Sequence, residues 1–172
     1  MKTIFLGGGC FWCLEAVYQQ LSGISSIESG YMDGNVDNPT YEQVCGSDTG
    51  HAEVIKIDYD PSIVSLTKIL DIFWQIHNPT TLNQQGNDIG SQYRSAVFVI
   101  DNSELELIQS SLNQAQPLWS DPIVTQISMA SKFYKAENYH QDYYNQHSWQ
   151  PYCQMVINPK VSKVKDLIKN AQ

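Results

Sequence analysis

The chain has 172 residues, of which 42% are hydrophobic and 16% charged, and this composition is typical of a globular protein with one domain, which we expect to span residues 1–172. The formal net charge is −8 and Arg94 is the only arginine, so we expect no nucleic-acid-binding surface. No stretch approaches the length of a membrane span, and the apolar run at residues 4–6 is too short for a secretory signal, so we expect no membrane association. Four cysteines do not make a disulfide scaffold in a chain of this size, which favours a cytoplasmic location.

The first predicted elements place a cysteine at the beginning of a helix. Residues 3–6 are predicted to form a strand, three glycines follow, and apolar residues then recur at helical spacing at Phe11, Leu14, Val17 and Leu21. Unpaired backbone N–H groups and the helix dipole favour a thiolate at Cys10, so we expect its pKa to be lowered. Cys13 lies one turn further, within disulfide range. With Phe11 and Trp12 between the thiols, the segment predicts a nucleophilic or redox-active cysteine beside an apolar surface.

The next elements alternate between strands and helical segments. Residues 24–31 are predicted to form a strand, residues 33–39 a loop, and residues 40–46 a short helical turn. Alternating side chains over residues 53–59 indicate a second strand. A longer helix is expected to follow, with Asp60 as its N-cap and Pro61 in its first turn, and to end at Asn78-Pro79.

A long polar loop separates this helix from the next strand. Residues 78–92 have no apolar periodicity, and structureless loops of this length are usually functional or disordered. Residues 94–100 and 123–129 are predicted to form strands. Between them we expect a helix that begins with a capping box of Ser103 and Glu106.

The end of the chain is predicted to be helical. Residues 138–147 favour a short helix, and apolar residues at helical spacing over residues 161–168 favour an amphipathic helix with a solvated lysine face. The order of elements is β-α-β, then β-α-β, then α-β. We therefore predict an α+β fold with a ferredoxin-like split βαβ core, in which an antiparallel or mixed sheet and its helices form a two-layer sandwich.

Four polar residues outside the cysteine motif are candidates for chemistry. Glu53 stands at the mouth of a half-buried strand, where desolvation would raise its pKa and make it a general acid near neutral pH. The alternative for Glu53 is an exposed charge at a strand end. Tyr41 and Tyr93 flank polar loops and can offer phenolic donors or simply pack, and Asp88 by itself is most often a loop-folding residue. These residues alone indicate a thiol enzyme or a thiol redox protein with an apolar site.

Five segments together resemble one known family. They are Gly-Cys-Phe-Trp-Cys-Leu-Glu at 9–15, Thr-Gly-His-Ala-Glu at 49–53, His-Asn-Pro-Thr-Thr at 77–81, Gln-Gly-Asn-Asp-Ile-Gly-Ser-Gln-Tyr-Arg-Ser at 85–95 and Ala-Glu-Asn-Tyr-His-Gln at 136–141. In this order, and over about residues 3–165, they resemble the peptide methionine sulfoxide reductase A family. The resemblance implies that Cys10 is the nucleophile and that Phe11 and Trp12 hold the methyl group of the substrate. The other functional positions of the family fall on Glu53, Tyr41, Asp88 and Tyr93.

The resemblance implies that the chain reduces methionine (S)-sulfoxide, free or in oxidised proteins, without a cofactor and with thioredoxin as external reductant. Protonated Glu53, with Tyr41 and Tyr93, would supply hydrogen-bond donors to the sulfoxide oxygen, which makes the sulfur electrophilic. The Cys10 thiolate would then attack the sulfur, release methionine and become a sulfenic acid. A second thiol would condense with this sulfenic acid to form a disulfide.

Two departures from the family leave that second thiol open. Cys13 stands where many members have glycine, and the tail after Cys153 has none of the recycling cysteines that many members carry. The spacing favours Cys13 as the resolving thiol, with Cys153 as the alternative or as a second relay thiol. Cys153 is expected to lie in an irregular stretch that approaches the site by loop motion.

Two other classes of protein compete with this interpretation. A thioredoxin-like dithiol oxidoreductase would use Cys10 and Cys13, but it would usually have tryptophan where Gly9 stands. A zinc-binding or peptide-binding module is the third class. The C-x-x-C pair is half a zinc site, yet Cys45 and Cys153 are isolated, so we expect no metal.

Overall fold

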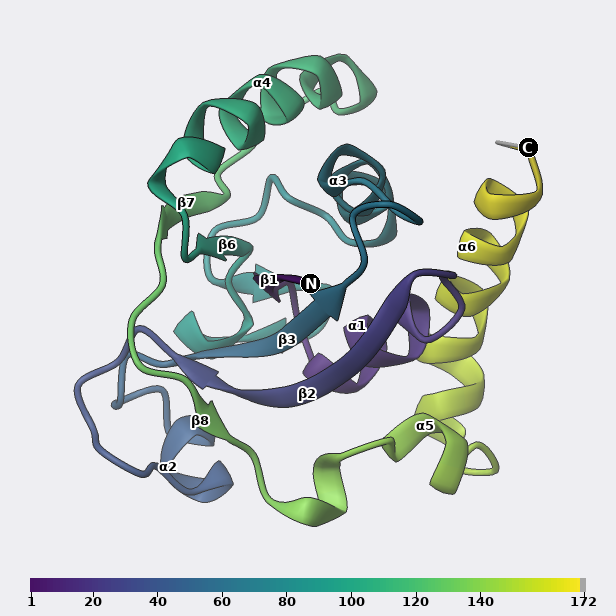
Figure 1. The fold of residues 1–172 in the computed structure, drawn as a ribbon. Coiled ribbons are helices and arrows are strands. Elements are labelled where there is room, and N and C mark those ends of the chain that lie inside the picture. The colour runs from purple at the N-terminus through teal and green to yellow at the C-terminus, as the bar shows by residue number, and fades with distance from the viewer. Residues whose placement is uncertain (171–172) are drawn as a thin grey trace.

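Six strands form one mixed sheet in the order β7-β6-β1-β3-β2-β8 in the computed structural model, which describes residues 1–170 (Figure 1). Their bounds are β1 Lys2–Gly7, β2 Ile24–Met32, β3 Ala52–Tyr59, β6 Ala96–Val99, β7 Gln126–Met129 and β8 Tyr134–Lys135. Neighbouring strands are antiparallel except β6 and β7, which are parallel. The α+β class and the mixed sheet agree with the prediction.

Two helices connect strands that are not neighbours in the sheet. Helix α1 (Phe11–Tyr18) joins β1 to β2, and β3 lies between those strands. Helix α3 (Leu66–Ile76) lies in the connection from β3 to β6, and β1 lies between those strands. The two crossover units are therefore interleaved, and the end of β1, which leads into α1, lies in the middle of the sheet.

The helices lie on one face of the sheet, as predicted (Figure 1). Helices α1 and α3 pack against α6 (Asn158–Asn170), and α3 also packs against α4 (Leu105–Ala115). Side chains alternate across β1, because successive residues of a strand point to opposite faces. Ile4 and Leu6 enter the large core beneath the helices, whereas Phe5 enters a smaller cluster on the other face, where Phe133 covers it.

Shorter elements complete the described chain. The helices are α2 (Tyr41–Cys45) and α5 (Tyr143–Gln146), and strands β4 (Gln84–Gln85) and β5 (Asp88–Ile89) form a hairpin. Single 3-10 turns are Ser91–Tyr93, Asn102–Glu104, Gln116–Leu118 and Asn138–His140, and a π-helical turn Cys153–Ile157 leads into α6. No helix within residues 1–170 is long and apolar enough to cross a membrane.

Two predicted helix starts are wrong for the same reason. The carboxylate of Asp60 accepts hydrogen bonds from the backbone and hydroxyl of Ser62, and α3 begins only after Ser65, whose side chain accepts from the Lys68 backbone. In the same way Asp101 accepts from the backbone and hydroxyl of Ser103, so the expected capping box of Ser103 and Glu106 does not form. In both cases the aspartate accepts a hydrogen bond from the N–H two residues later and forms a separate turn, so the helix begins further along the chain than predicted.

The polar loop and the end of the chain are more structured than predicted. The segment 78–92 contains the β4–β5 hairpin and is not structureless. The helix expected over residues 138–147 is interrupted at Asp142, whose φ of 55° is left-handed. Cys153, which we expected in an irregular mobile stretch, is fully buried in the π-helical turn. The first helix also ends at Tyr18 rather than near Leu21, and strand β7, predicted over residues 123–129, begins at Gln126.

Candidate active site

A glycine turn delivers Cys10 to the N-terminus of α1. Cys10 is the N-cap residue, with extended backbone angles, and its carbonyl oxygen accepts from the Cys13 N–H at 3.1 Å. A Cβ atom at Gly8 would lie 2.9 Å from the His77 ring, and one at Gly9 would lie 2.8 Å from the Gln85 side chain. Gly9 also has a φ of 84°. Glycine therefore lets the chain pass between these two side chains and places the thiol beyond them.

Cys10 opens on a cavity of about 500 Å³ between α1, the β4–β5 hairpin and the beginning of α6. The residues that line it are Cys10, Cys13, Gln85, Gly86, Asn87, Asp88, Tyr152, Val156 and Lys160. The polar loop that we expected to be functional thus forms one wall. It brings Asp88 to the same cavity as Cys10, although 77 positions separate them in the sequence.

The pKa of Cys10 is raised, not lowered as we expected. Only 8% of Cys10 is exposed, and this burial raises the pKa of the thiol well above its ordinary value. Negative charge on Glu53 and Cys13 acts in the same direction, and a hydrogen bond from the Trp12 backbone opposes it. The prediction considered only the N-terminus of the helix, which lowers the pKa of a thiol. Loss of water around the thiolate raises the pKa by more than the N-terminus of an eight-residue helix lowers it. The resting group is therefore a thiol.

Glu53 is a desolvated carboxyl group next to Cys10, as expected. The residue is 1% exposed, and its Oε1 accepts from the backbone N–H of Phe11 at 3.2 Å. Its Oε2 has no hydrogen-bond partner among the described residues. Burial raises the pKa of Glu53 to about 8, and the charge of Asp88 contributes to this rise. Glu53 is therefore mostly protonated at neutral pH and has an oxygen free to donate that proton.

Tyr41 and Tyr93 both lie near enough to Glu53 for its charge to affect the pKa of their phenols. Burial raises the pKa of each phenol, and negative charge on Glu53 and Cys10 raises it further. Both therefore remain protonated donors at any physiological pH. Tyr41 is the first residue of α2, which begins with a capping box between Thr40 and Gln43. The carbonyl oxygen of Tyr93 accepts from the Gly9 N–H at 3.2 Å, which fastens the tyrosine to the turn before Cys10.

The two aromatic residues after Cys10 lie in different environments. Trp12 is partly exposed, its ring stacks on Tyr143 at 3.7 Å between centroids, and its indole N–H donates to Nδ1 of His140 at 3.1 Å. Phe11 is 0% exposed and packs between Tyr31 and His140. We expected both rings to face the substrate, but only Trp12 has accessible surface. Phe11 lies in the layer behind it, because helix α1 is packed against the sheet on that side.

Cys13 and Cys153 are both buried, and all four cysteines are free thiols. The Sγ atom of Cys13 lies 3.7 Å from the Tyr152 hydroxyl. Burial raises the pKa of both thiols, and the pKa of Cys153 is raised further by Cys13. Cys13 thus lines the cavity together with Cys10, and its negative charge also acts on Cys153. Sequence reasoning missed Tyr152 and placed Lys160 on a solvated face, because only the packing of the π-helical turn brings them to the cavity.

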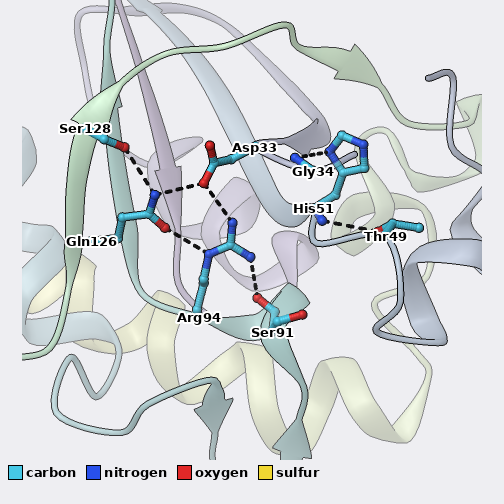
Figure 2. Close-up of polar contacts among 8 residues, drawn as sticks. All are labelled: Asp33, Gly34, Thr49, His51, Ser91, Arg94, Gln126 and Ser128. Atoms are coloured by element: carbon cyan, nitrogen blue, oxygen red, sulfur yellow. Dashed lines mark hydrogen bonds and ion pairs between the residues drawn. The ribbon is translucent and has the colours of Figure 1, made fainter. Parts of the chain in front are cut away.

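A network around Arg94 holds the turn that carries Tyr93 (Figure 2). The guanidinium donates to the Ser91 carbonyl at 2.8 Å, to Asp33 at 3.1 Å and to the Gln126 side chain at 3.0 Å. The Gln126 amide in turn donates to Asp33 at 2.8 Å. The network therefore joins the end of β2, the turn at Ser91–Tyr93 and the beginning of β7.

His51 holds a second segment, beside Glu53 on β3. Figure 2 shows its ring nitrogen Nδ1, which accepts from the Gly34 backbone at 3.0 Å, and its other ring nitrogen donates to the Val36 carbonyl at 2.7 Å. Both ring nitrogens of His51 are therefore hydrogen-bonded to the backbone. The ring fixes the loop that leads to α2 and Tyr41.

Replacing Arg94 by methionine should lower the free energy of unfolding by about 1–3 kcal/mol, because it leaves a carboxylate, a carbonyl and an amide without their charged donor. Arg94→Lys should recover only part of this loss, because an ammonium group cannot form all three hydrogen bonds that the planar guanidinium donates. Urea unfolding of each variant measures the effect. Lys135→Met is the control, since its exposed pair with Glu28 should contribute less than about 1 kcal/mol. If Arg94→Met is as stable as the control, the network does not stabilise the fold.

Within the described residues no group of three or more His, Cys, Asp or Glu side chains is arranged to hold a metal ion.

The sequence model of the family described as "Peptide methionine sulfoxide reductase" matches residues 2–172. A relative from Paenarthrobacter aurescens, named "Peptide methionine sulfoxide reductase MsrA", is 52% identical over 165 residues, which are 96% of this chain and 95% of that protein.

Solved structures are similar as well. The reduced form of Mxr1 from Saccharomyces cerevisiae has a TM-score of 0.84 and 38% identity, and the match covers 88% of each chain. Mxr1 in complex with Trx2 has a TM-score of 0.60 and 28% identity over 83% of this chain and 84% of that one.

Proposed function

The chain belongs to the peptide methionine sulfoxide reductase family, and on this basis we propose how its residues reduce methionine sulfoxide to methionine with thioredoxin as external reductant. The observation that carries the mechanism is the pair formed by a buried Cys10 and a buried, protonated Glu53. Glu53 accepts from the N–H of the residue after Cys10, and a neighbouring nucleophile and proton donor can act on the two ends of a sulfur–oxygen bond at once.

In the first step the sulfoxide oxygen faces the free Oε2 of Glu53, and the methyl group lies against Trp12. Glu53 donates its proton to the oxygen, and the Cys10 sulfur attacks the sulfoxide sulfur as a thiolate. The attack forms a bond between the Cys10 sulfur and the substrate sulfur. This bond and the sulfur–oxygen bond of the substrate then break as the protonated oxygen moves to the Cys10 sulfur, so methionine leaves and Cys10 is a sulfenic acid. The proton lost by Cys10 replaces the one lost by Glu53, so the carboxyl group ends the step as it began.

The other residues of the site have supporting roles in this proposal. Tyr41 and Tyr93, which keep their protons, donate hydrogen bonds to the developing charge on the oxygen. Asp88 shapes the cavity wall opposite Cys10. The backbone N–H of Phe11 orients Glu53, and the Phe11 ring packs against His140, which accepts from the Trp12 indole.

The substrates in this proposal are free methionine (S)-sulfoxide and (S)-sulfoxides in oxidised proteins, and the cavity of about 500 Å³ has room for one methionine side chain. We further propose one domain over residues 1–172 with a ferredoxin-like core, which the order β6-β1-β3-β2 and the two interleaved crossovers support. Four free thiols are consistent with a reducing, cytoplasmic location.

The test of this function is reduction of the separate epimers of methionine sulfoxide, free and in a peptide. We expect turnover of the S epimer with thioredoxin or dithiothreitol and no turnover of the R epimer. Dithiothreitol replaces thioredoxin in reducing the oxidised thiols, so turnover with dithiothreitol but not with thioredoxin separates a failure of recycling by thioredoxin from a failure of catalysis. Disulfide exchange without any sulfoxide reduction would instead favour the thioredoxin-like dithiol oxidoreductase.

Cys13 is the resolving thiol in this proposal, because it lines the same cavity as Cys10, whereas Cys153 does not line it. Cys13→Ser should release one equivalent of methionine and then stall with thioredoxin. Peptide mapping of the parent after one equivalent of sulfoxide should find a disulfide between Cys10 and Cys13. The matched variant is Cys153→Ser, and if it stalls while Cys13→Ser turns over normally, Cys153 is the resolving thiol.

A further inference from the structure

A lysine from the C-terminal helix lies at the wall of the thiol cavity. Lys160, in α6, is half-buried and lines the cavity together with Cys10 and Cys13. Among the described residues its ammonium group has no ion pair within 4 Å and no hydrogen bond. By contrast, Lys163 on the same helix donates to the Gln75 carbonyl and Lys165 is exposed. A half-buried cation without a structural partner is unusual, because burial of an unpaired charge costs free energy.

The group that Lys160 affects is the second thiol of the pair. The titratable groups that face Cys13 are Cys10, Glu53, Asp88, Tyr152, Cys153 and Lys160. Burial raises the pKa of Cys13, and the positive charge of Lys160 is the largest influence that opposes this rise. The Tyr152 hydroxyl, 3.7 Å from Sγ, acts in the same direction as Lys160. Lys160 is the only positively charged residue that lines the cavity.

We propose that Lys160 is a positioning residue for recycling, which stabilises Cys13 as the thiolate that attacks the sulfenic acid on Cys10. The Cys13 sulfur forms a bond to the Cys10 sulfur, and the bond between that sulfur and its hydroxyl oxygen breaks. Hydroxide leaves and combines with the proton that Cys13 had lost, so the products are one disulfide and one water. The oxidising equivalent comes from the methionine sulfoxide of the first step. The proposal therefore rests on the proposed function.

The test follows the two steps separately after mixing reduced protein with one equivalent of methionine sulfoxide. Methionine release measures the first step, and loss of dimedone-reactive sulfenic acid measures formation of the disulfide. In Lys160→Met we expect the ratio of the second rate to the first to fall about tenfold at pH 7, and the pH midpoint of the second step to rise by about one unit. Lys160→Arg should restore both values because it restores the charge. Lys165→Met, an exposed change on the same helix, is the control.

The outcomes distinguish this proposal from the function on which it rests. If the parent releases no methionine, the proposed function is wrong, and the role of Lys160 that rests on it is wrong as well. If the parent releases methionine, but the second step of Lys160→Met has the parent's rate and pH midpoint, the role of Lys160 is wrong. An equal loss in Lys160→Met and Lys160→Arg would also overturn it, because packing rather than charge would then be responsible. Thermal unfolding of each variant identifies any that fold poorly.

Discussion

Replacing Cys10 by serine should abolish release of methionine from methionine sulfoxide, even in a single turnover. The substitution removes the only sulfur that stands both at the N-terminus of α1 and beside Glu53. A serine hydroxyl is a far weaker nucleophile than a thiolate at neutral pH, and it cannot form a sulfenic acid. Quenched-flow measurement of methionine, with no external reductant present, isolates this first step.

Cys45→Ser is the matched control for this experiment. Cys45 is exposed at the end of α2 and does not line the cavity that Cys10 and Cys13 share. This variant should release one equivalent of methionine at nearly the parent rate. A Cys10→Ser protein that still reduces the sulfoxide would exclude the proposed mechanism, whatever the behaviour of the other thiols.

Replacing Glu53 by glutamine should slow the first step by about 100-fold or more, because general acid catalysis commonly contributes that factor. Glutamine keeps the size of the side chain and can still accept a hydrogen bond from the Phe11 N–H, but it has no proton to transfer. The measurement is again the rate of methionine release in a single turnover. Substrate affinity should change much less than the rate.

The pH dependence gives a second readout for Glu53. Because its pKa is raised to about 8, the carboxyl group is protonated below pH 8 and loses its proton as the pH rises through that value. The first step of the parent should therefore slow down above pH 8. In Glu53→Gln this decline should be absent. A variant as fast as the parent at every pH would remove Glu53 from the role of proton donor.

Glu15→Gln is the control for a purely structural effect. Glu15 is likewise buried, with a pKa raised to about 7, but its side chain accepts from the Tyr143 backbone and joins α1 to α5. Its charge is not among those that raise the pKa of Cys10, whereas the charge of Glu53 is. If this variant slows the first step as much as Glu53→Gln does, loss of a buried carboxyl group perturbs α1 in general, and the effect at Glu53 is not specific to proton transfer.

Local patterns in the sequence were sufficient for the elements and for the position of the nucleophile. Strand β3 could be predicted because alternation has a period of two, and α1 could be predicted because its apolar residues recur at helical spacing. Three glycines between a strand and a helix were enough to place Cys10 at a helix terminus. The five motifs identified the family, because each is a short stretch that can be matched without knowledge of the fold.

The tertiary structure decided the properties that depend on what packs over a residue. The pKa of Cys10 is raised because burial removes water from it and because Glu53 adds negative charge nearby. The hairpin and the segment 152–160 line its cavity, and no local pattern contains those segments. Phe11 and Trp12 are neighbours and both are apolar, but the Phe11 ring is buried and the Trp12 ring is partly exposed. Their different positions relative to the sheet cause this difference. Lys160 belongs to a run of lysines whose spacing indicates a solvated face, but the π-helical turn before α6 brings it to the thiols. The spacing of apolar residues and the residues that form turns can be recognised within a few positions of the sequence. Loss of water around a side chain and the approach of another charge depend on segments that lie far apart in the sequence.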